Sequence, residues 1–401
     1  MPLVVIGGRR MQIPTDNVVG YESARVVDPE LAANYVAHTQ IGDPIADTLV
    51  EQLSSLPRDE STRLLEAVVD DPDAAILRDA PPAVHDFLED LESVPDWVDT
   101  SEFGPGVRLF HRDSTTAMAA MVAGSLVEGF TTNIAKSFFI SGRLRDQGVR
   151  RLKQNNRHLV EIMIPGGLEA QGDGWRLSVR IRVIHAQIRR LFSNSQDWDP
   201  EAWGLPLHAA HLGFAITVFS ARLLKHMAGL GVPMNDEERA SFMAIWRYTG
   251  YLMGIPETIL FRDEPEALRI YRIGLLCEPT CQMESIAMAN SLINSAPVIA
   301  GITDPAQRRK LAKYVFRVSR ALIGKQFADD LMYPDARTAG VLASYRLERR
   351  YHRFVNERFP RLARDTSFTA FNALLDISAV DESRITYKLP DHAYAEESSP
   401  W

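Results

Sequence analysis

One histidine stands out because of the side chains that surround it on a predicted helix over Trp175–Phe192. On a helical wheel centred on His185, apolar side chains fill one adjoining arc, and Arg182 and Arg189 fill the other. The two arginines stand at i−3 and i+4 from the histidine, so they share its face. The apolar arc consists of Leu177, Ile181, Ile184, Ile188, Leu191 and Phe192.

This combination of an imidazole, an apolar arc and two cations fits the chemistry of a haem. The porphyrin ring requires apolar neighbours, its propionates attract arginine, and a neutral imidazole is a common axial ligand of haem iron. Although a lone histidine on a helix seam is more often structural, the pattern allows a haem b site with His185 as metal ligand and with Arg182 and Arg189 as cofactor-binding residues. It also fits a histidine that makes hydrogen bonds at a helix interface, beside arginines that extend along the surface to solvent.

A second pair of polar residues, Arg151 and Asn155, is one turn apart on a predicted helix over Arg143–Ile164. Both side chains can therefore face one cavity, and hydrogen-bond donors in such a cavity decide what a haem does with dioxygen. We predict that both are catalytic residues that line such a cavity. The alternative is a solvated basic face that Arg151 shares with Arg150, Lys153 and Arg157.

Two further clusters have the residue types of metal sites. His208 and His211 have a spacing that can ligate zinc or a di-iron centre, but no Glu-x-x-His motif accompanies them. We predict buried or capping histidines, with His211 as the fallback axial ligand. Cys277 and Cys281 are too few for a disulfide framework and are predicted to be partly buried free thiols. A structural zinc site or a redox pair is the alternative for the cysteines.

The overall composition is that of an ordinary soluble protein. The chain has 401 residues, 46% of them hydrophobic, which is enough for a buried core, and its net charge is −8. This charge argues against general binding to nucleic acid or to an anionic membrane. No stretch approaches the ~20 apolar residues of a transmembrane helix. No hydrophobic region follows the pair Arg9-Arg10, so we expect a cytoplasmic protein without an export signal.

Helical periodicity dominates the chain and predicts an all-α fold, because little of the sequence alternates with period two. A long helix is expected over Gly106–Phe139 and an apolar one over Leu207–Ala228. The best-marked helix is Asp236–Met253, with Asn235 as N-cap and Gly254 after its end. Residues 1–42 are expected to be irregular. Further helices are expected in residues 43–93, 265–276, 284–300, 305–324 and 337–358.

These elements suggest three parts of the chain. Residues 1–93 form an amino-terminal segment of irregular structure and short helices that packs on the core. Residues 94–360 form the helical haem-binding domain, and residues 361–401 form a polar tail. No phosphate loop, dinucleotide fingerprint or Gly-x-Ser-x-Gly motif is present, so the common nucleotide-binding and hydrolase classes are excluded.

Several short segments carry a resemblance to a known family, in their residues, their order and their spacing. They are Val94–Val98, Arg151–Asn155, Ile164–Gly167, Gly172–Trp175, Arg180–Arg189 and Trp246–Pro256. In these segments the chain resembles the catalytic domain shared by bacterial latex-clearing proteins, or rubber oxygenases, and the endoplasmic-reticulum-bound oxygenase of mycophenolic acid biosynthesis. The resemblance implies a globin-like helical core around haem b. It matches His185 to the proximal ligand, Arg182 and Arg189 to its flanking arginines, and Arg151 to a distal arginine.

The chain departs from rubber oxygenases on the distal side. Their Lys-Thr pair, three and four residues after the distal arginine, is replaced by Gln154 and Asn155. Their catalytic glutamate aligns without gaps to Ala135, and the nearest upstream acid is Glu128. We therefore do not expect polymer cleavage, although we expect the haem site to be retained. Glu128 is only a weak candidate for a base.

The leading hypothesis is a haem b-dependent oxygenase or related oxidoreductase. It would act on a small or medium apolar organic substrate with dioxygen or peroxide. The competing hypotheses are a non-enzymatic haem sensor or carrier and a cofactor-free helical interaction protein. The sequence predicts neither the substrate nor the oligomeric state.

Overall fold

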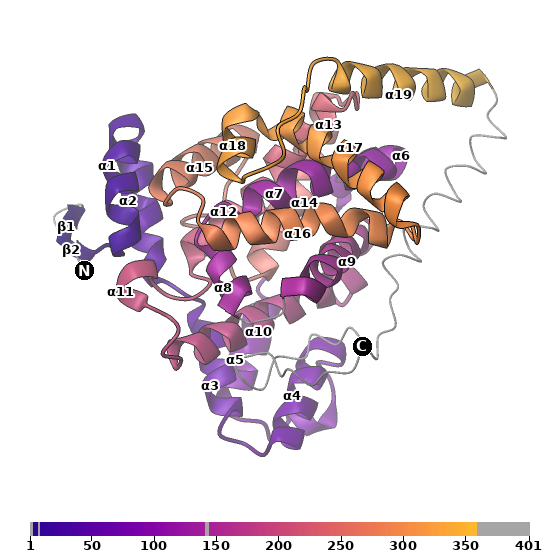
Figure 1. Cartoon of the computed structure of the whole chain (residues 1–401). Helices are drawn as coiled ribbons and strands as arrows, with labels where there is room; N and C mark the ends of the chain where they lie inside the picture. Colours follow the sequence, from indigo (N-terminus) through magenta and orange to yellow (C-terminus); the bar gives the residue numbers. More distant parts are fainter. Residues whose placement is uncertain (1–2, 7–8, 141–143, 359–401) are drawn as a thin grey trace.

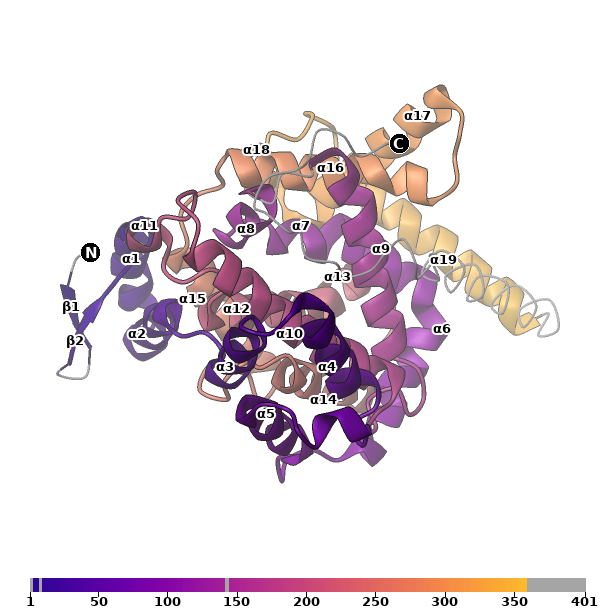
Figure 2. The same cartoon turned by 90° about the horizontal axis from the view of Figure 1, so that it is seen from below.

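The computed structural model describes residues 3–6, 9–140 and 144–358 and shows an all-α body with one short hairpin (Figure 1). The antiparallel hairpin pairs β1 (Leu3–Ile6) with β2 (Arg9–Gln12) and lies at the edge of the body in both views (Figure 2). The predicted all-α fold class is confirmed. The tail predicted over 361–401 lies outside the described residues.

The amino-terminal part is helical where the sequence analysis expected irregular structure up to residue 42. Helix α1 (Val18–Val27) is followed by α2 (Pro29–Ala37), and Asp28 between them accepts a hydrogen bond from the backbone N–H of Leu31. An aspartate N-cap followed by proline is a common helix start, so this prediction is wrong although its signal was present. The short helices expected in residues 43–93 are α3 (Pro44–Leu53), α4 (Arg58–Asp70) and α5 (Pro82–Glu92).

The long helix expected over Gly106–Phe139 is interrupted. Its segments are α6 (Gly104–Ala120), the π-helical turn η5 (Met121–Ser125), α7 (Leu126–Gly129) and α8 (Ile134–Ile140). Between α7 and α8 the Thr131 hydroxyl donates to the carbonyl of Glu128, and the backbone N–H of Asn133 donates to the Glu278 carboxylate. These bonds compete with those of a continuous helix and end it.

The apolar helix expected over Leu207–Ala228 also contains a π-helical turn. Its segments are α12 (Ala209–Thr217), η6 (Val218–Arg222) and α13 (Leu223–Gly229). The turns η5 and η6 pack against each other in the interior. Because each turn depends on its neighbour in the fold, helical periodicity alone did not predict either.

Three helices that bear on the candidate site follow the predicted boundaries closely. They are α9 (Leu144–Ile162), α10 (Asp173–Ser193) and α14 (Asp236–Leu252). As predicted, Asn235 caps α14: its side-chain oxygen accepts from the backbone N–H of Glu238, and its backbone N–H donates to the Glu238 carboxylate in a capping box. The other α-helices are α11 (Pro200–Trp203), α15 (Glu264–Cys277), α16 (Met283–Ile299), α17 (Pro305–Ile323), α18 (Lys325–Asp330) and α19 (Val341–Arg358).

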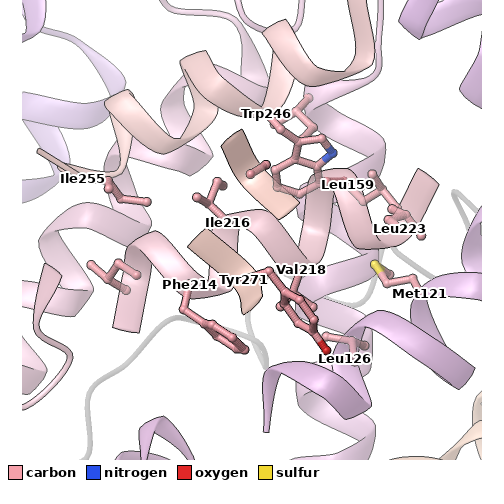
Figure 3. Close-up of a cluster of buried hydrophobic side chains, with 14 of the residues drawn as sticks. Met121, Leu126, Leu159, Phe214, Ile216, Val218, Leu223, Trp246, Ile255 and Tyr271 are labelled. Carbon is pink, nitrogen blue, oxygen red and sulfur yellow. The ribbon is translucent and has the colours of Figure 1, made fainter. Parts of the chain in front are cut away.

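The core lies where α9, α12, η6, α14 and α15 converge. Figure 3 shows Leu159 of α9, Trp246 of α14 and Tyr271 of α15 in one buried cluster around η6. Helix α16 runs along α9, and α3 packs against α10 on the other side (Figure 1). The amino-terminal helices therefore cover the helix that carries His185. The domain boundary at residue 93 stays a prediction.

Within the part of the chain that the structure describes, no helix has the length and apolar character needed to span a bilayer.

Candidate functional site

The candidate site is built on the hairpin of α9 and α10, whose connection brings the two backbones close together. The backbone N–H of Trp175 donates to the carbonyl of Gly167 at 2.8 Å. A Cβ atom at Gly174 would lie 2.7 Å from the carbonyl oxygen of Glu161 and 2.8 Å from the Cα of Ile162. A side chain at position 174 would push the helices apart, and this explains the glycines in the connecting motifs.

A buried histidine links the two helices near this connection. The Nε2–H of His158 on α9 donates to the Oγ of Ser178 on α10 at 3.0 Å, because that hydroxyl donates its own proton to the carbonyl of Gly174. Burial lowers the pKa of His158 to about 4, so the ring is neutral near neutral pH. The imidazole also packs edge-on against Trp246 of α14. The sequence analysis assigned His158 no role, because its partner is 20 residues away.

This contact relates the helix faces that carry the predicted site residues. Position 151 lies seven residues before His158, and His185 lies seven residues after Ser178. Seven residues are nearly two full turns, so each pair shares one face of its helix. The faces that meet at His158 and Ser178 are therefore the faces that carry position 151 and His185. The side chain of Arg151 lies outside the described residues, and Asn155 is half-buried on α9.

His185 has surroundings that fit an iron-bound imidazole. It is half-buried on α10, and Ile181, Ile184 and Ile188 beside it are half-buried too. Partly exposed isoleucines next to a partly exposed imidazole match what a porphyrin requires of its proximal face. The residues present therefore fit a haem on this side of α10.

The two arginines beside His185 point to carboxylates of the amino-terminal helices. The guanidinium of Arg182 binds the carboxylate of Asp43, with Nε 2.6 Å from Oδ2, and its Nη1 lies 2.6 Å from the Oδ2 of Asp90. Arg189 donates from Nε to the Oδ1 of Asp47 at 2.8 Å and from Nη1 to the carbonyl of Leu207. Both arginines are buried, so the loss of a partner carboxylate would leave a buried charge without compensation.

These ion pairs bear on the predicted cofactor-binding role. Each arginine is engaged by a carboxylate, and such a group is poorly placed to neutralise a propionate as well. The geometry instead fits a role in orienting the helix that carries His185. The sequence analysis did not identify the aspartates, although Asp43-Pro44 is a helix-start signal that places Asp43 at the first turn of α3.

Glu128, the weak candidate for a base, is committed to a buried ion cluster. Its carboxylate binds the guanidinium of Arg222 and lies 3.1 Å from the Nε2 of His226. Burial alone would raise the pKa of Glu128, but His226 and Arg222 lower it to about 2. A carboxylate with this pKa is a poor proton acceptor, so the cluster explains Glu128 as a structural anion that joins α7 to η6 and α13.

His208 and His211 form a second buried cluster. The Nδ1 of His208 accepts a hydrogen bond from the backbone N–H of His211 and caps α12, and the rings stack 3.6 Å apart. The Nε2 of His211 lies 3.3 Å from the carboxylate of Glu278, which also accepts a hydrogen bond from Tyr35. The prediction of buried or capping histidines is confirmed.

Cys277 is buried and Cys281 is half-buried, and both are free, as predicted. Burial raises the pKa of Cys281 to about 11 and that of Cys277 further, so both are thiols at neutral pH. Among the described residues, no group of three histidine, cysteine, aspartate or glutamate side chains could hold a metal ion.

Comparison with known proteins places this geometry in context. Residues 108–357 match the model of a family described as "ER-bound oxygenase mpaB/B'/Rubber oxygenase, catalytic domain". Among solved structures, that of latex clearing protein LCP in the closed state matches with a TM-score of 0.65 and 16% sequence identity, covering 85% of this chain and 91% of that chain. At this identity the likeness shows the fold alone. No curated protein matches the chain.

Proposed function

We propose that this chain, which belongs to the family of the rubber oxygenases and of the ER-bound oxygenase mpaB, is a haem b-dependent oxygenase or related oxidoreductase. Family membership supports an oxygenase-type function, and haem dependence is our proposal. The observation that carries it is the half-buried His185 beside half-buried isoleucines, on the face of α10 that meets the face of α9 bearing position 151.

The proposed roles on the proximal side follow from α10. His185 would hold the iron through a neutral imidazole nitrogen, and Ile181 and Ile188 would contact the porphyrin body. When bound, the haem supplies the activation of dioxygen or peroxide. Arg182 and Arg189 hold α10 against α3 and so orient the imidazole, which is a positioning role.

On the opposite side, α9 supplies the polar groups. Arg151 and Asn155 would donate hydrogen bonds to a polar atom held between α9 and α10, which is how distal donors direct haem chemistry. The isoleucines beside His185 fit a small or medium apolar organic substrate as part of this proposal. Gln154 and Asn155 replace the Lys-Thr pair of rubber oxygenases, so we do not propose polymer cleavage. A cytoplasmic location is part of the same proposal.

One observation favours a second candidate, a non-enzymatic haem sensor or carrier. The catalytic glutamate of rubber oxygenases aligns to Ala135, and the upstream acid Glu128 is paired with Arg222 and His226. A site without a base can still bind a haem and a diatomic ligand. Product formation separates this candidate from the oxygenase.

The experiment compares the wild-type protein with His185→Ala and with a matched control, His85→Ala, whose side chain is exposed on α5. All three are prepared with haem precursor and offered unsaturated apolar compounds under dioxygen and under peroxide. We expect oxygenated product from the wild type and the control, and neither haem nor product from His185→Ala. Full haem content in His185→Ala would show that His185 is not the iron ligand. A wild-type protein that binds haem but forms no product would favour the non-enzymatic sensor or carrier.

A further inference from the structure

Helix α19 presents three large apolar side chains to solvent on the side that faces away from the body. Leu347, Tyr351 and Phe354 are 69%, 65% and 66% exposed. Their spacing of i, i+4 and i+7 puts them in one stripe along the helix. Both views show α19 at the periphery, where it projects past α17 and α6 (Figures 1 and 2). Single exposed apolar residues are ordinary, but an aligned row of three large ones marks an interaction surface.

The opposite face of α19 is already occupied by the protein. Val341 is buried and Tyr345 is partly buried against the core. The guanidinium of Arg349 forms an ion pair with Asp113 on α6. These contacts fix the rotation of α19 about its axis, so the exposed stripe is held outward by the packing of the other face.

The charge of α19 identifies the kind of surface that its outward face fits. The helix contains five arginines and two glutamates, whereas the whole chain carries a net charge of −8. The exposed arginines Arg346 and Arg350 lie on one side of the apolar stripe, and Arg358 continues its line one turn beyond Phe354. The expectation that the protein does not bind anionic membranes in general rests on the charge of the whole chain, and this one helix has the opposite sign of charge.

We propose that the outward face of α19 docks on the surface of an anionic lipid bilayer. The apolar stripe enters the boundary between headgroups and acyl chains, and the flanking arginines bind lipid phosphates while their stems lie along the stripe. An amphipathic helix of 18 residues is about 27 Å long and lies in the plane of the interface. This mode of binding requires no membrane-spanning helix.

A second copy of the chain fits this face less well. In a symmetric dimer the same patch meets itself, so stripe-to-stripe pairing would bring the arginines of both copies together. Like charges at such an interface disfavour the pairing, whereas lipid phosphates neutralise them. The inference does not depend on haem chemistry, and its test reads lipid binding alone.

The test is co-sedimentation of the full chain with vesicles of phosphatidylcholine alone or of equimolar phosphatidylcholine and phosphatidylglycerol, in about 0.1 M salt. We expect binding to the anionic vesicles at least about tenfold stronger than to the neutral ones, with loss in about 1 M salt. Leu347→Gln/Phe354→Gln and Arg350→Glu/Arg358→Glu should each lose binding. The conservative pair Arg350→Lys/Arg358→Lys should retain it.

A matched control changes two exposed apolar residues on other helices, Val26→Gln and Met283→Gln, and should bind as the wild type does. Wild-type protein that stays in solution with anionic vesicles would overturn the proposal. So would binding that survives both α19 variants, because another surface would then be responsible. A dimer in solution that dissociates in Leu347→Gln/Phe354→Gln would assign the face to a second copy instead.

Discussion

At the scale of single residues, the role of an ionisable group in this protein depends on its partner more than on its type. Arg182, Arg189 and Glu128 were candidates for cofactor binding or catalysis, and each is engaged by a counter-charge from another part of the chain. No sequence pattern indicated a role for His158, and its hydrogen bond to Ser178 joins α9 to α10. The helical wheel showed which residues share a face, but it could not show which distant side chains occupy that face.

The buried ion pair of Arg182 can be tested against an exposed pair on the same helix. Arg182→Ala leaves Asp43 buried without its cation and should destabilise the protein by about 3–5 kcal/mol. Arg180→Ala removes a partly exposed pair with Asp70 and should cost at most about 1 kcal/mol. Urea unfolding of the three proteins measures the difference. Equal stability of the two variants would show that the buried pair does not fasten α10.

His158 predicts a pH dependence of stability. Its pKa is about 4 in the folded protein and near the ordinary 6.5 in the unfolded chain, so the unfolded state binds more protons between these values. Stability should therefore fall as the pH falls through this window, by about 2 kcal/mol between about pH 7 and about pH 5. His158→Gln keeps a donor for Ser178 and does not titrate. The stability of this variant, measured by denaturant unfolding, should no longer fall by this amount as the pH is lowered. An unchanged pH dependence would show that His158 is not the group responsible.

At the scale of elements, helix ends were predictable and interruptions were not. Asn235 and Gly254 mark the limits of α14 with local signals, and the structure agrees with them. The π-helical turns η5 and η6 have no local signal, because they arise where two buried segments pack together. Gly124 in η5 shows the constraint, since a Cβ atom there would lie 2.6 Å from the ring of His226.

The close approach of α9 and α10 is the element-scale feature on which the candidate site depends. Gly174→Ala would bring its Cβ against backbone atoms of Glu161 and Ile162, and we expect a loss of about 1–3 kcal/mol together with weaker haem binding. Gly129→Ala is the matched control, because the nearest atom to its Cβ is 4.0 Å away. Haem titration and thermal unfolding measure both effects. Wild-type haem affinity in Gly174→Ala would show that this spacing does not shape the site.

At the scale of the whole molecule, the all-α class and the family were predictable from periodicity and motif order. The dependence of the site on the amino-terminal helices was not, because Asp43 and Arg182 are 139 residues apart in the chain. No local pattern reveals a pairing over such a separation. The amino-terminal segment is thus part of the support for α10.

This architecture makes a prediction about truncation. A chain that starts at residue 94 lacks Asp43, Asp47 and Asp90, so it leaves Arg182 and Arg189 without carboxylates and uncovers the side of α10 that α3 packs against. We expect it to be insoluble or to lack cooperative unfolding, as circular dichroism would show. A soluble and cooperatively folded chain of residues 94–358 would mean that the segment is dispensable.

The most direct test of the central claim is the absorption spectrum of the purified protein, prepared with haem precursor and recorded before and after dithionite. With haem b bound to His185, we expect a Soret band that shifts on reduction and a b-type pyridine haemochrome, both lost in His185→Ala. A featureless spectrum that added haemin does not change would contradict the haem site.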